Sequence, residues 1–334
     1  MLKFYSHIFA VLLAGLFLCA CSPAIPTAAP PSATASPLPL LTPTLTPSLT
    51  LNATSTPTPL VPNFQHIVIV VFENEEFGSV VGNSKMPYFN KLARSYTLLT
   101  QYYAVTHPSL PNYIAMIGGD TLGITFDCTS CRVVPDDTQS LPDLVEASGR
   151  TWKTYQEDMP SSCFAGTESG KYAMKHNPFI YFMPIRLDAQ RCNQSIVPLT
   201  HLSLDIAAGA LPNFIFVTPN MCNDAHDCDV RTADTWLQSF MNRLMPPLDQ
   251  SDQPYLIVLT WDEGQGNHSC CGLPAEAGGR IATILVSPQA KNGFQDSTPY
   301  THYSLLKTIA AAWGLPYLKH AADTQTSVIV APWK

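Results

Sequence analysis

The chain has 334 residues, of which 46% are hydrophobic and 13% are charged. This length and composition exclude a disordered tail or a repeat array and allow one large domain with a full core. The formal net charge of -7 argues against a nucleic-acid partner, so a small anionic substrate would need a local cation, such as a bound metal ion.

The N-terminus has the pattern of an export signal. Lys3 precedes an apolar run, Ile8–Leu18, that is too short to span a bilayer well. The Leu-Cys-Ala-Cys segment at 18–21 resembles the lipobox of bacterial lipoproteins, and that resemblance makes Cys21 the lipidated first residue of the mature protein. The alternative is a cleaved signal without lipid. Residues 1–21 therefore predict export, and a lipidated Cys21 would hold the protein at a membrane surface, outside the cytoplasm.

Residues 22–62 form a second distinct segment. They contain no charged residue and are dominated by Pro, Thr, Ser and Ala. Such a stretch cannot bury enough apolar surface to fold. We therefore expect a disordered linker over 22–62 and a single folded domain over 63–334.

Eight of the 10 cysteines lie in the predicted domain, because only Cys19 and Cys21 belong to the signal. Three close pairs stand out: Cys128 with Cys131, Cys222 with Cys228, and the adjacent Cys270 and Cys271. In a cytosolic protein such pairs would suggest zinc ligands, whereas export favours disulfides. Cys163 with Cys192 is the expected longer-range bridge, although spacing alone does not fix the pairing.

Apolar runs rich in β-branched residues predict four strands buried on both faces: His66–Phe72, Asn213–Val217, Tyr255–Leu259 and Ile281–Val286. Helical patterns occur at Tyr88–Tyr96, Leu141–Ala147, Thr235–Leu244 and Tyr303–Trp313. Buried strands that alternate with helices predict an α/β fold, a three-layer sandwich around a mostly parallel sheet.

Oxygen-bearing side chains follow three of these strands. Glu73 and Asn74 come after the first, Asn220 follows the second, and Asp262 and Glu263 follow the third. In open α/β sheets, ligands bind outside the carboxyl ends of the strands. The pattern favours one site at that edge, although polar residues also begin at strand ends without any functional reason.

Ser109 lies just before a predicted helix, in the segment Thr-His-Pro-Ser-Leu-Pro-Asn-Tyr at 106–113. The free N–H groups and the dipole at a helix start favour an anionic phosphate, and Pro111 suits the first helical turn. Ser109 can be a helix cap, a nucleophile or both, because both roles need the same position.

The Ser-Leu-Pro-Asn-Tyr segment resembles the nucleophile motif of the alkaline phosphatase superfamily, which includes the Thr-x-Pro-Asn pattern of nucleotide pyrophosphatases and phosphodiesterases. The wider chain is similar to the phosphoesterase family of acid phosphatases and phosphatidylcholine-type phospholipases C. Matching segments lie at 71–74, 106–113, 155–160, 175–179, 220–227, 261–263 and 301–304. Their order and combination are specific, and they imply an alkaline-phosphatase-like fold for essentially the whole chain after the linker.

The resemblance also implies roles for individual residues. It makes Ser109 the transiently phosphorylated nucleophile and Asn112 a donor to a phosphate oxygen. The ligands of at least one divalent metal ion would be Glu73, Asn74, Asp262 and Glu263. Hard oxygen ligands of this kind suit such a cation.

Two features of the sequence qualify this ligand set. Because Glu73 and Asn74 are adjacent, both can coordinate only if the strand ends there. Serine replaces the phosphodiesterase threonine, and glutamate with asparagine replaces the usual aspartate of the first strand. The sequence therefore does not support a second, fully occupied metal site.

Histidines supply the remaining candidates. His226 lies in a polar cluster and His302 opens a helix, so either is a candidate to protonate the leaving group or bind phosphate. Four further residues lie inside the family motifs and are possible substrate-binding or supporting residues: His107, His176, Asn220 and Asp224. For the other histidines named here, His66, His201 and His320, a structural role is expected.

The sequence thus predicts an exported, metal-dependent, acid-phosphatase-like monoesterase of small phosphoesters that works through a phosphoserine. One alternative is a phospholipase C or other phosphodiesterase. Members of that branch are generally longer, so the end of this chain at Lys334 favours the monoesterase. Another alternative is a lipid-tethered binding protein without catalysis. The combination of Ser109 with four metal-ligand candidates argues against this alternative.

Overall fold

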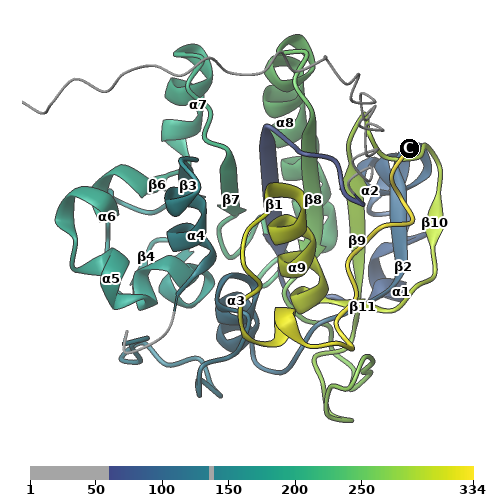
Figure 1. Cartoon of the computed structure of the whole chain (residues 1–334), viewed down its shortest axis with the longest axis horizontal. Helices are drawn as coiled ribbons and strands as arrows, with labels where there is room; N and C mark the ends of the chain where they lie inside the picture. Colours follow the sequence, from purple (N-terminus) through teal and green to yellow (C-terminus); the bar gives the residue numbers. More distant parts are fainter. Residues whose placement is uncertain (1–59, 135–138) are drawn as a thin grey trace, which may run out of the picture. The chain divides into compact units, whose positions relative to one another are not determined.

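The structure is a computed structural model that describes residues 60–134 and 139–334 (Figure 1). The predicted signal, the lipidation site Cys21 and most of the predicted linker lie outside these residues. Val61, near the end of the predicted linker, is already buried in the hydrophobic core. Within the described ranges, no helix is long and apolar enough to cross a membrane.

A nine-stranded sheet forms the centre of the domain. Its strands run in the order β10-β2-β9-β8-β1-β7-β3-β6, and β11 also pairs with β2. Their bounds are β1 His66–Phe72, β2 Thr97–Tyr103, β3 Trp152–Gln156, β6 Ile196–Pro198, β7 Phe214–Thr218, β8 Tyr255–Trp261, β9 Arg280–Val286, β10 Gln295–Asp296 and β11 Tyr300–Thr301. A separate hairpin joins β4 Glu168–Ser169 to β5 Tyr172–Ala173.

The inner strands are parallel and buried. β8, β1, β7, β3 and β6 run parallel to one another, whereas β9 is antiparallel to both β8 and β2. Six of the seven residues of β1 are buried, which matches its continuous apolar sequence. The sheet is therefore covered on both faces and mostly parallel, as predicted.

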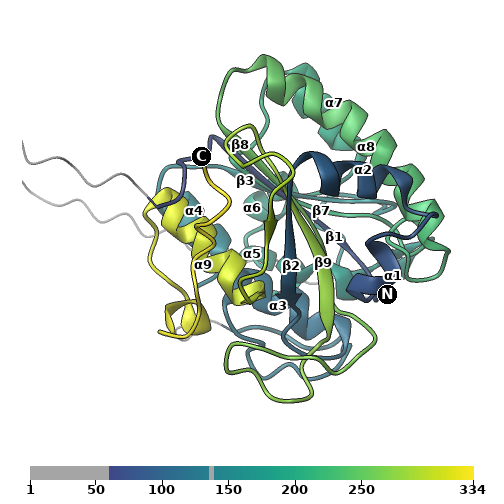
Figure 2. The ribbon, with the colours of Figure 1, turned by 90° about the vertical axis from the view of Figure 1, so that its right-hand side faces the viewer.

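Helices cover both faces of the sheet (Figure 2). One layer contains α2 Pro87–Ser95 and α8 Val230–Gln250, which pack against each other. The opposite layer contains α3 Ser109–Gly118, α4 Leu141–Ala147 and α9 His302–Trp313. The remaining helices are α1 Phe77–Val80, α5 Met183–Arg186, α6 Ala189–Ser195 and α7 Thr200–Ala207, with short 3-10 turns η1 Met174–His176, η2 Pro178–Tyr181 and η3 Lys319–Ala322. The predicted three-layer α/β fold is confirmed.

Four disulfides link the eight cysteines of the domain: Cys128–Cys131, Cys163–Cys192, Cys222–Cys228 and Cys270–Cys271. The expected longer-range bridge between Cys163 and Cys192 is among them. Disulfides persist in oxidising compartments, so this set indicates an extracytoplasmic protein.

Candidate active site

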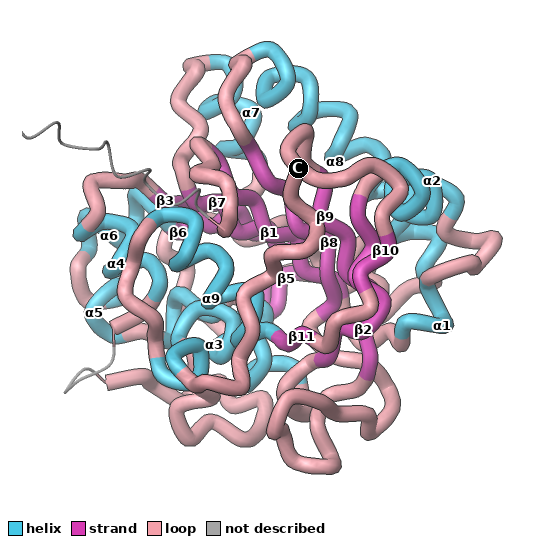
Figure 3. The backbone as a smooth tube through the Cα atoms, turned by 45° about the vertical axis from the view of Figure 1, so that its right-hand side comes forward, coloured by secondary structure: helices cyan, strands magenta, loops and turns pink. Residues whose placement is uncertain are grey.

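Long loops gather beyond the carboxyl ends of the parallel strands (Figure 3). Phe72 at the end of β1 pairs in register with Trp261 at the end of β8. The residues that follow, Glu73 and Asp262, therefore leave neighbouring strands at the same level. The sequence prediction that these strand ends build one site agrees with this arrangement.

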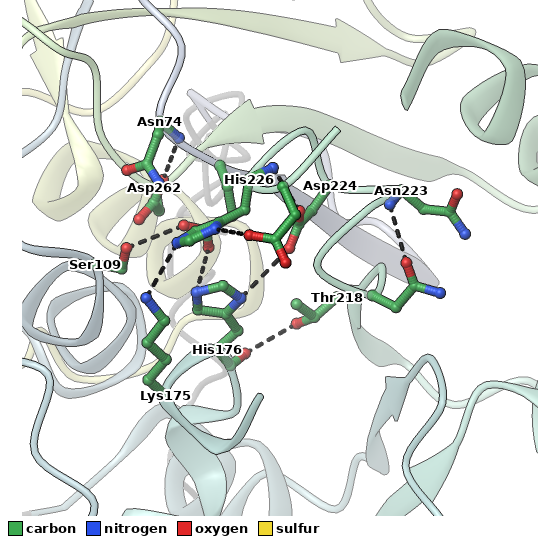
Figure 4. Close-up of polar contacts among 12 residues, drawn as sticks. Asn74, Ser109, Lys175, His176, Thr218, Asn223, Asp224, His226 and Asp262 are labelled. Carbon is green, nitrogen blue, oxygen red and sulfur yellow. Dashed lines mark hydrogen bonds and ion pairs between the residues drawn. The ribbon is translucent and has the colours of Figure 1, made fainter. Parts of the chain in front are cut away.

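Asn74 satisfies the geometric condition set by its neighbour Glu73. β1 ends at Phe72, and Asn74 has a φ of 57°, so the chain turns out of the strand immediately. The backbone N–H of Asn74 donates a hydrogen bond to Asp262 Oδ1 at 3.1 Å. Glu73 and Asn74 can therefore face the same space. Figure 4 shows the side chain of Asn74 beside that of Asp262.

Ser109 is the first residue of α3 and is only 2% exposed. Its hydroxyl oxygen lies 3.0 Å from Glu73 Oε2 and 3.1 Å from Glu263 Oε1. One hydroxyl proton can serve one of these acceptors at a time, so the serine lies between two carboxylates that can take its proton. The opposite side of Glu73 accepts a hydrogen bond from the Tyr113 hydroxyl, one turn along α3.

Burial makes the charged forms of these acids unfavourable. It raises the pKa of Glu73 well above the ordinary value, and repulsion from Asp262 and Asp224 adds to the rise. The pKa of Asp262 rises to about 7 through burial and the charge of Glu263, and burial raises that of Glu263 to about 7. Burial likewise raises the pKa of Asp224. Four acids in one buried site therefore call for a cation.

The donor atoms fit a divalent metal ion. Within residues 60–134 and 139–334, three buried atoms of this site have no hydrogen-bond partner: Asp262 Oδ2, Asp224 Oδ2 and His176 Nε2. Glu73, His176 and Asp224 each offer one ligand atom, and these atoms lie within 4.8 Å of one another. Carboxylate oxygens with one imidazole form a donor set that divalent metals accept.

Glu73 lies between two groups of candidate ligands. The predicted ligands Asn74, Asp262 and Glu263 lie on the β8 side, and His176 and Asp224 lie on the other. From the sequence, the last two are expected only as supporting residues. Their position beside Glu73 makes them candidate ligands as well, a relation that the sequence does not display because the two residues are 48 positions apart.

His176 is held in the form that a metal ligand requires. Its Nε2 lies 3.3 Å from Glu73 Oε1 and its Nδ1 lies 3.4 Å from Asp224 Oδ2. The ring stacks on Tyr113 with centroids 5.3 Å apart. Burial lowers the pKa of His176 well below its ordinary value, and the charges of Lys175 and His226 lower it further. The imidazole is therefore neutral near pH 7, with a lone pair available for coordination.

His226 lies at the rim of the site, beside Lys175 (Figure 4). Its Nε2 is 3.2 Å from the Lys175 ammonium, and its Nδ1 is 2.7 Å from Asp227 Oδ1. Because an ammonium group only donates, Nε2 accepts and Nδ1 carries the proton toward Asp227. The short loop that carries His226 and Asp224 is closed by the Cys222–Cys228 disulfide.

His107 contacts the site from the segment before α3. Its Nδ1 contacts Glu263 Oε2, and its Nε2 lies 3.2 Å from the carbonyl oxygen of Gly266. An open cleft of about 500 Å³ lies here, lined by Asn74, His107, Pro108, Glu263, Gly264, Gln265 and Asn267. His107 therefore joins the nucleophile segment to the loop after β8 at the mouth of the site.

The predicted role of His302 does not fit its position. His302 is fully buried, with Nε2 2.7 Å from the backbone oxygen of Asp262 and Nδ1 3.4 Å from the Tyr102 hydroxyl. Burial lowers its pKa to about 4. With both ring nitrogens engaged and no contact with solvent, His302 positions the Asp262 backbone from behind and is not placed to protonate a leaving group.

Asn112 also differs from its predicted role as a phosphate donor. Its Oδ1 accepts from the N–H groups of Val105 and Thr106 at 3.0 and 3.2 Å. Its amide nitrogen donates to the carbonyl oxygens of Thr106 and Pro108 at 2.8 and 3.1 Å. All four bonds go to backbone groups, so Asn112 folds the loop that presents His107 and Ser109.

Asn220 lies in the loop after β7 but does not reach the acidic centre. Its side chain donates to Asp158 at 2.8 Å and accepts from the N–H groups of Cys222 and Asn223. It therefore shapes the turn that delivers Asp224. The oxygen donor that follows β7 into the site is Asp224, four residues further along the chain than Asn220.

In the metal-free protein, the free energy of unfolding should fall as the pH rises from about 7 to about 8.5, because unfolded carboxyls titrate near 4. With the raised pKa values of Glu73, Asp262 and Glu263, the folded state binds more protons than the unfolded state, so loss of those protons destabilises it. Buried His176 and His302 act in the opposite direction, but mainly below about pH 6.5, where unfolded histidine titrates.

Thermal unfolding in chelator at both ends of this pH range checks the expectation. The unfolding midpoint should be lower at the higher pH, and Asp262→Asn should reduce the difference. An unfolding midpoint that rises with pH in the metal-free protein would show that the acidic cluster is not the titrating group.

The chain is similar in sequence to known phosphatases. The phosphoesterase family matches residues 82–316. A phosphate-repressible acid phosphatase of Penicillium chrysogenum is 35% identical over 279 residues, which cover 80% of this chain and 64% of that protein. A phosphatidylinositol-3-phosphatase of Mycobacterium tuberculosis is 30% identical, over 79% of this chain and 81% of that protein. The match thus spans under two thirds of the length of the Penicillium relative.

Solved structures show the same fold at low sequence identity. A protein in the alkaline phosphatase superfamily from Vibrio parahaemolyticus has a TM-score of 0.50 and 12% identity, over 79% of this chain and 71% of that one. A sulfatase from a Pseudoalteromonas species has a TM-score of 0.52 and 12% identity, over 81% of this chain and 74% of that one. These likenesses concern the architecture alone.

Proposed function

Because the chain belongs to the phosphoesterase family, we propose that it is a metal-dependent hydrolase of phosphate monoesters in which Ser109 is the nucleophile. The observation that carries the proposal is the buried Ser109 hydroxyl, which lies between Glu73 and Glu263 at the start of α3. The relatives named acid phosphatase support the substrate class.

The proposed first step forms the bond between Ser109 Oγ and phosphorus while the bond from phosphorus to the alcohol oxygen breaks. The Ser109 proton passes to one of the two carboxylates that already lie within hydrogen-bond distance. The N-terminus of α3 favours the negative charge of the phosphoryl group beside Ser109. His226, once protonated and paired with Asp227, is the proposed proton source for the departing oxygen.

The second step restores the enzyme. Water attacks the phosphoserine and gives a proton to His226, which the first step left neutral. The bond from phosphorus to Ser109 Oγ breaks, the carboxylate returns its proton to Ser109 Oγ, and inorganic phosphate leaves. The ligands proposed to hold a divalent cation are Glu73, Asn74, Asp262 and Glu263, with His176 and Asp224 beside Glu73. Such a cation supplies Lewis-acid chemistry, which stabilises charge on phosphoryl oxygens and lowers the pKa of a bound hydroxyl.

A comparison of two substrates tests the substrate class. We expect kcat/KM for p-nitrophenyl phosphate to exceed that for bis(p-nitrophenyl) phosphate by at least about tenfold, which corresponds to roughly 1.4 kcal/mol of transition-state stabilisation. A preference for the diester would identify a phosphodiesterase. A protein that binds both esters but releases no product would be a binding protein.

The proposed location follows from the N-terminal sequence and the disulfides. We place the enzyme outside the cytoplasm, tethered to the membrane through a lipid on Cys21, with small phosphoesters and no nucleic acid as partners. Cell fractionation tests the tether, because Cys21→Ser should move the protein from the membrane fraction to the soluble fraction.

A further inference from the structure

We propose that Lys175 is the residue that selects dianionic phosphate at this site, and that Asp127 is the carboxylate that the phosphoryl group displaces from it. The inference rests on the proposed function and deepens it, because it names a residue that distinguishes monoesters from diesters.

Lys175 brings a positive charge to a site that is otherwise acidic. It lies in η1, one residue before His176, and its side chain is 22% exposed. The ammonium lies 3.1 Å from Asp127 Oδ2 and 3.2 Å from His226 Nε2. Both partners lie at this site, because Asp127 also accepts from the first turn of α3 beside Ser109, and His226 donates its backbone N–H to Asp224. Lys175 therefore lies close enough to the acidic centre to meet an anion bound there.

Asp127 bridges the two anion-binding groups beside the nucleophile. Its Oδ1 accepts from the backbone N–H of Leu110 at 2.9 Å, and its Oδ2 pairs with Lys175. Leu110 directly follows Ser109 in the first turn of α3, where unpaired N–H groups favour anions. The Asp127 carboxylate thus accepts from a helix N–H group and from an ammonium group. Together these two donors suit a phosphoryl group on Ser109.

The surroundings allow Asp127 to leave. Its side chain is 27% exposed and belongs to the loop between α3 and α4, just before the Cys128–Cys131 disulfide. A cavity of about 380 Å³ opens beside it, and Lys171, Tyr172, Lys175 and Met221 are among its lining residues. Asp127 can therefore swing toward solvent while Lys175 and the Leu110 N–H turn to the incoming phosphoryl group.

The charge of the substrate decides how much Lys175 contributes. A phosphate monoester carries nearly two negative charges above its second pKa of about 6. A diester carries only one. An ammonium group and a helix N-terminus bind the dianion more strongly, and the dianion also competes better with the Asp127 carboxylate. Lys175 should thus favour monoesters over diesters.

Calorimetric titration of the full-length, metal-loaded protein with inorganic phosphate tests the inference without relying on turnover. Lys175→Met should weaken phosphate binding about ten- to a hundredfold, since a charge-assisted hydrogen bond is lost. Lys175→Arg should keep part of the affinity. Lys171→Met is the matched control, because Lys171 is an exposed lysine of the same cavity, and its phosphate affinity should equal that of the wild type.

Asp127→Asn tests the displacement separately. Asparagine can still accept from the Leu110 N–H but no longer competes as an anion, so phosphate should bind a few-fold more tightly. In the same set, Lys175→Met should lower the ratio of monoester to diester kcat/KM, whereas Lys171→Met leaves the ratio unchanged.

Three results would overturn the inference. Wild-type phosphate affinity in Lys175→Met would remove Lys175 from the binding site. Weaker phosphate binding in Asp127→Asn would show that Asp127 holds Lys175 in place and is not displaced. An unchanged substrate ratio in Lys175→Met would refute the selection of dianions. If Lys175→Met does not fold, Lys175→Gln and Asp127→Asn distinguish the same outcomes. Phosphate binding through Lys175 without any hydrolysis would contradict the proposed function alone.

Discussion

Ser109→Ala should lower kcat/KM for p-nitrophenyl phosphate by at least about 10³-fold, the scale seen when a nucleophile is removed. The substitution leaves Glu73 and Glu263 in place but removes the one oxygen that both carboxylates contact. Without it, a phosphoryl group has no acceptor at the start of α3. Steady-state rates of the purified, metal-loaded variant measure the loss.

A second serine separates this chemical effect from a loss of folding. Ser287 is also fully buried, but its hydroxyl donates to the backbone oxygen of Tyr255, outside the site. Ser287→Ala should therefore keep the activity per folded molecule. Activity near the wild-type rate in Ser109→Ala would mean that hydrolysis proceeds by direct attack of water, which the proposed mechanism does not include.

Metal removal should be the next largest effect. Exhaustive chelation should reduce the rate by at least about a hundredfold, and a divalent ion should restore it, because the ion supplies several kcal/mol of charge stabilisation in such sites. The reason lies in the cluster itself. Glu73, Asp262 and Asp224 are buried together, and when the site lacks a cation only protonation relieves their mutual repulsion.

Glu73→Gln tests the centre of that cluster. Glu73 is the acid that lies between the two groups of candidate ligands, and glutamine preserves its shape without its charge. Elemental analysis should find a lower metal content than in the wild type, together with a comparable loss of activity. Glu276→Gln, at an exposed position, should change neither quantity. Full activity after chelation, with no metal in the protein by elemental analysis, would refute the requirement.

The strands that carry the site were predictable because their sequences are extreme. β1 and β8 are continuous apolar runs, as buried parallel strands require, and polar residues begin where each strand ends. This local pattern alone places Glu73 and Asp262 at one edge of a sheet. The start of α3 was predictable for a similar reason, because Ser109 and Pro111 mark a helix N-terminus.

Other strands were missed because polar residues interrupt them. β3 contains Lys153, which is nevertheless accommodated because its ammonium pairs with Asp205 at 2.7 Å. Asp205 also accepts a hydrogen bond from Tyr155. The direction of β9 was equally hidden, since an apolar run buried on both faces has the same pattern in a parallel or an antiparallel strand. These features depend on partners distant in the sequence.

The same limit applies to the roles of single residues. Asn112 and His302 lie inside family motifs, but the sequence does not reveal that the Asn112 amide binds backbone groups or that His302 lies behind Asp262. The partnership of His176 with Asp224 likewise arises only when η1 and the loop after β7 meet. A motif therefore indicates which residues lie near the site, and the tertiary contacts determine the role of each residue.

In the proposed reaction, the phosphoryl group passes through a covalent phosphoserine at Ser109. Acid quenching of the wild-type enzyme during turnover of p-nitrophenyl phosphate, followed by peptide mass spectrometry, tests it most directly. We predict one added phosphoryl group on the peptide that contains Ser109, and none in Ser109→Ala treated in the same way. Rapid turnover with Ser109 unmodified at every quench time, and with activity retained in Ser109→Ala, would contradict it.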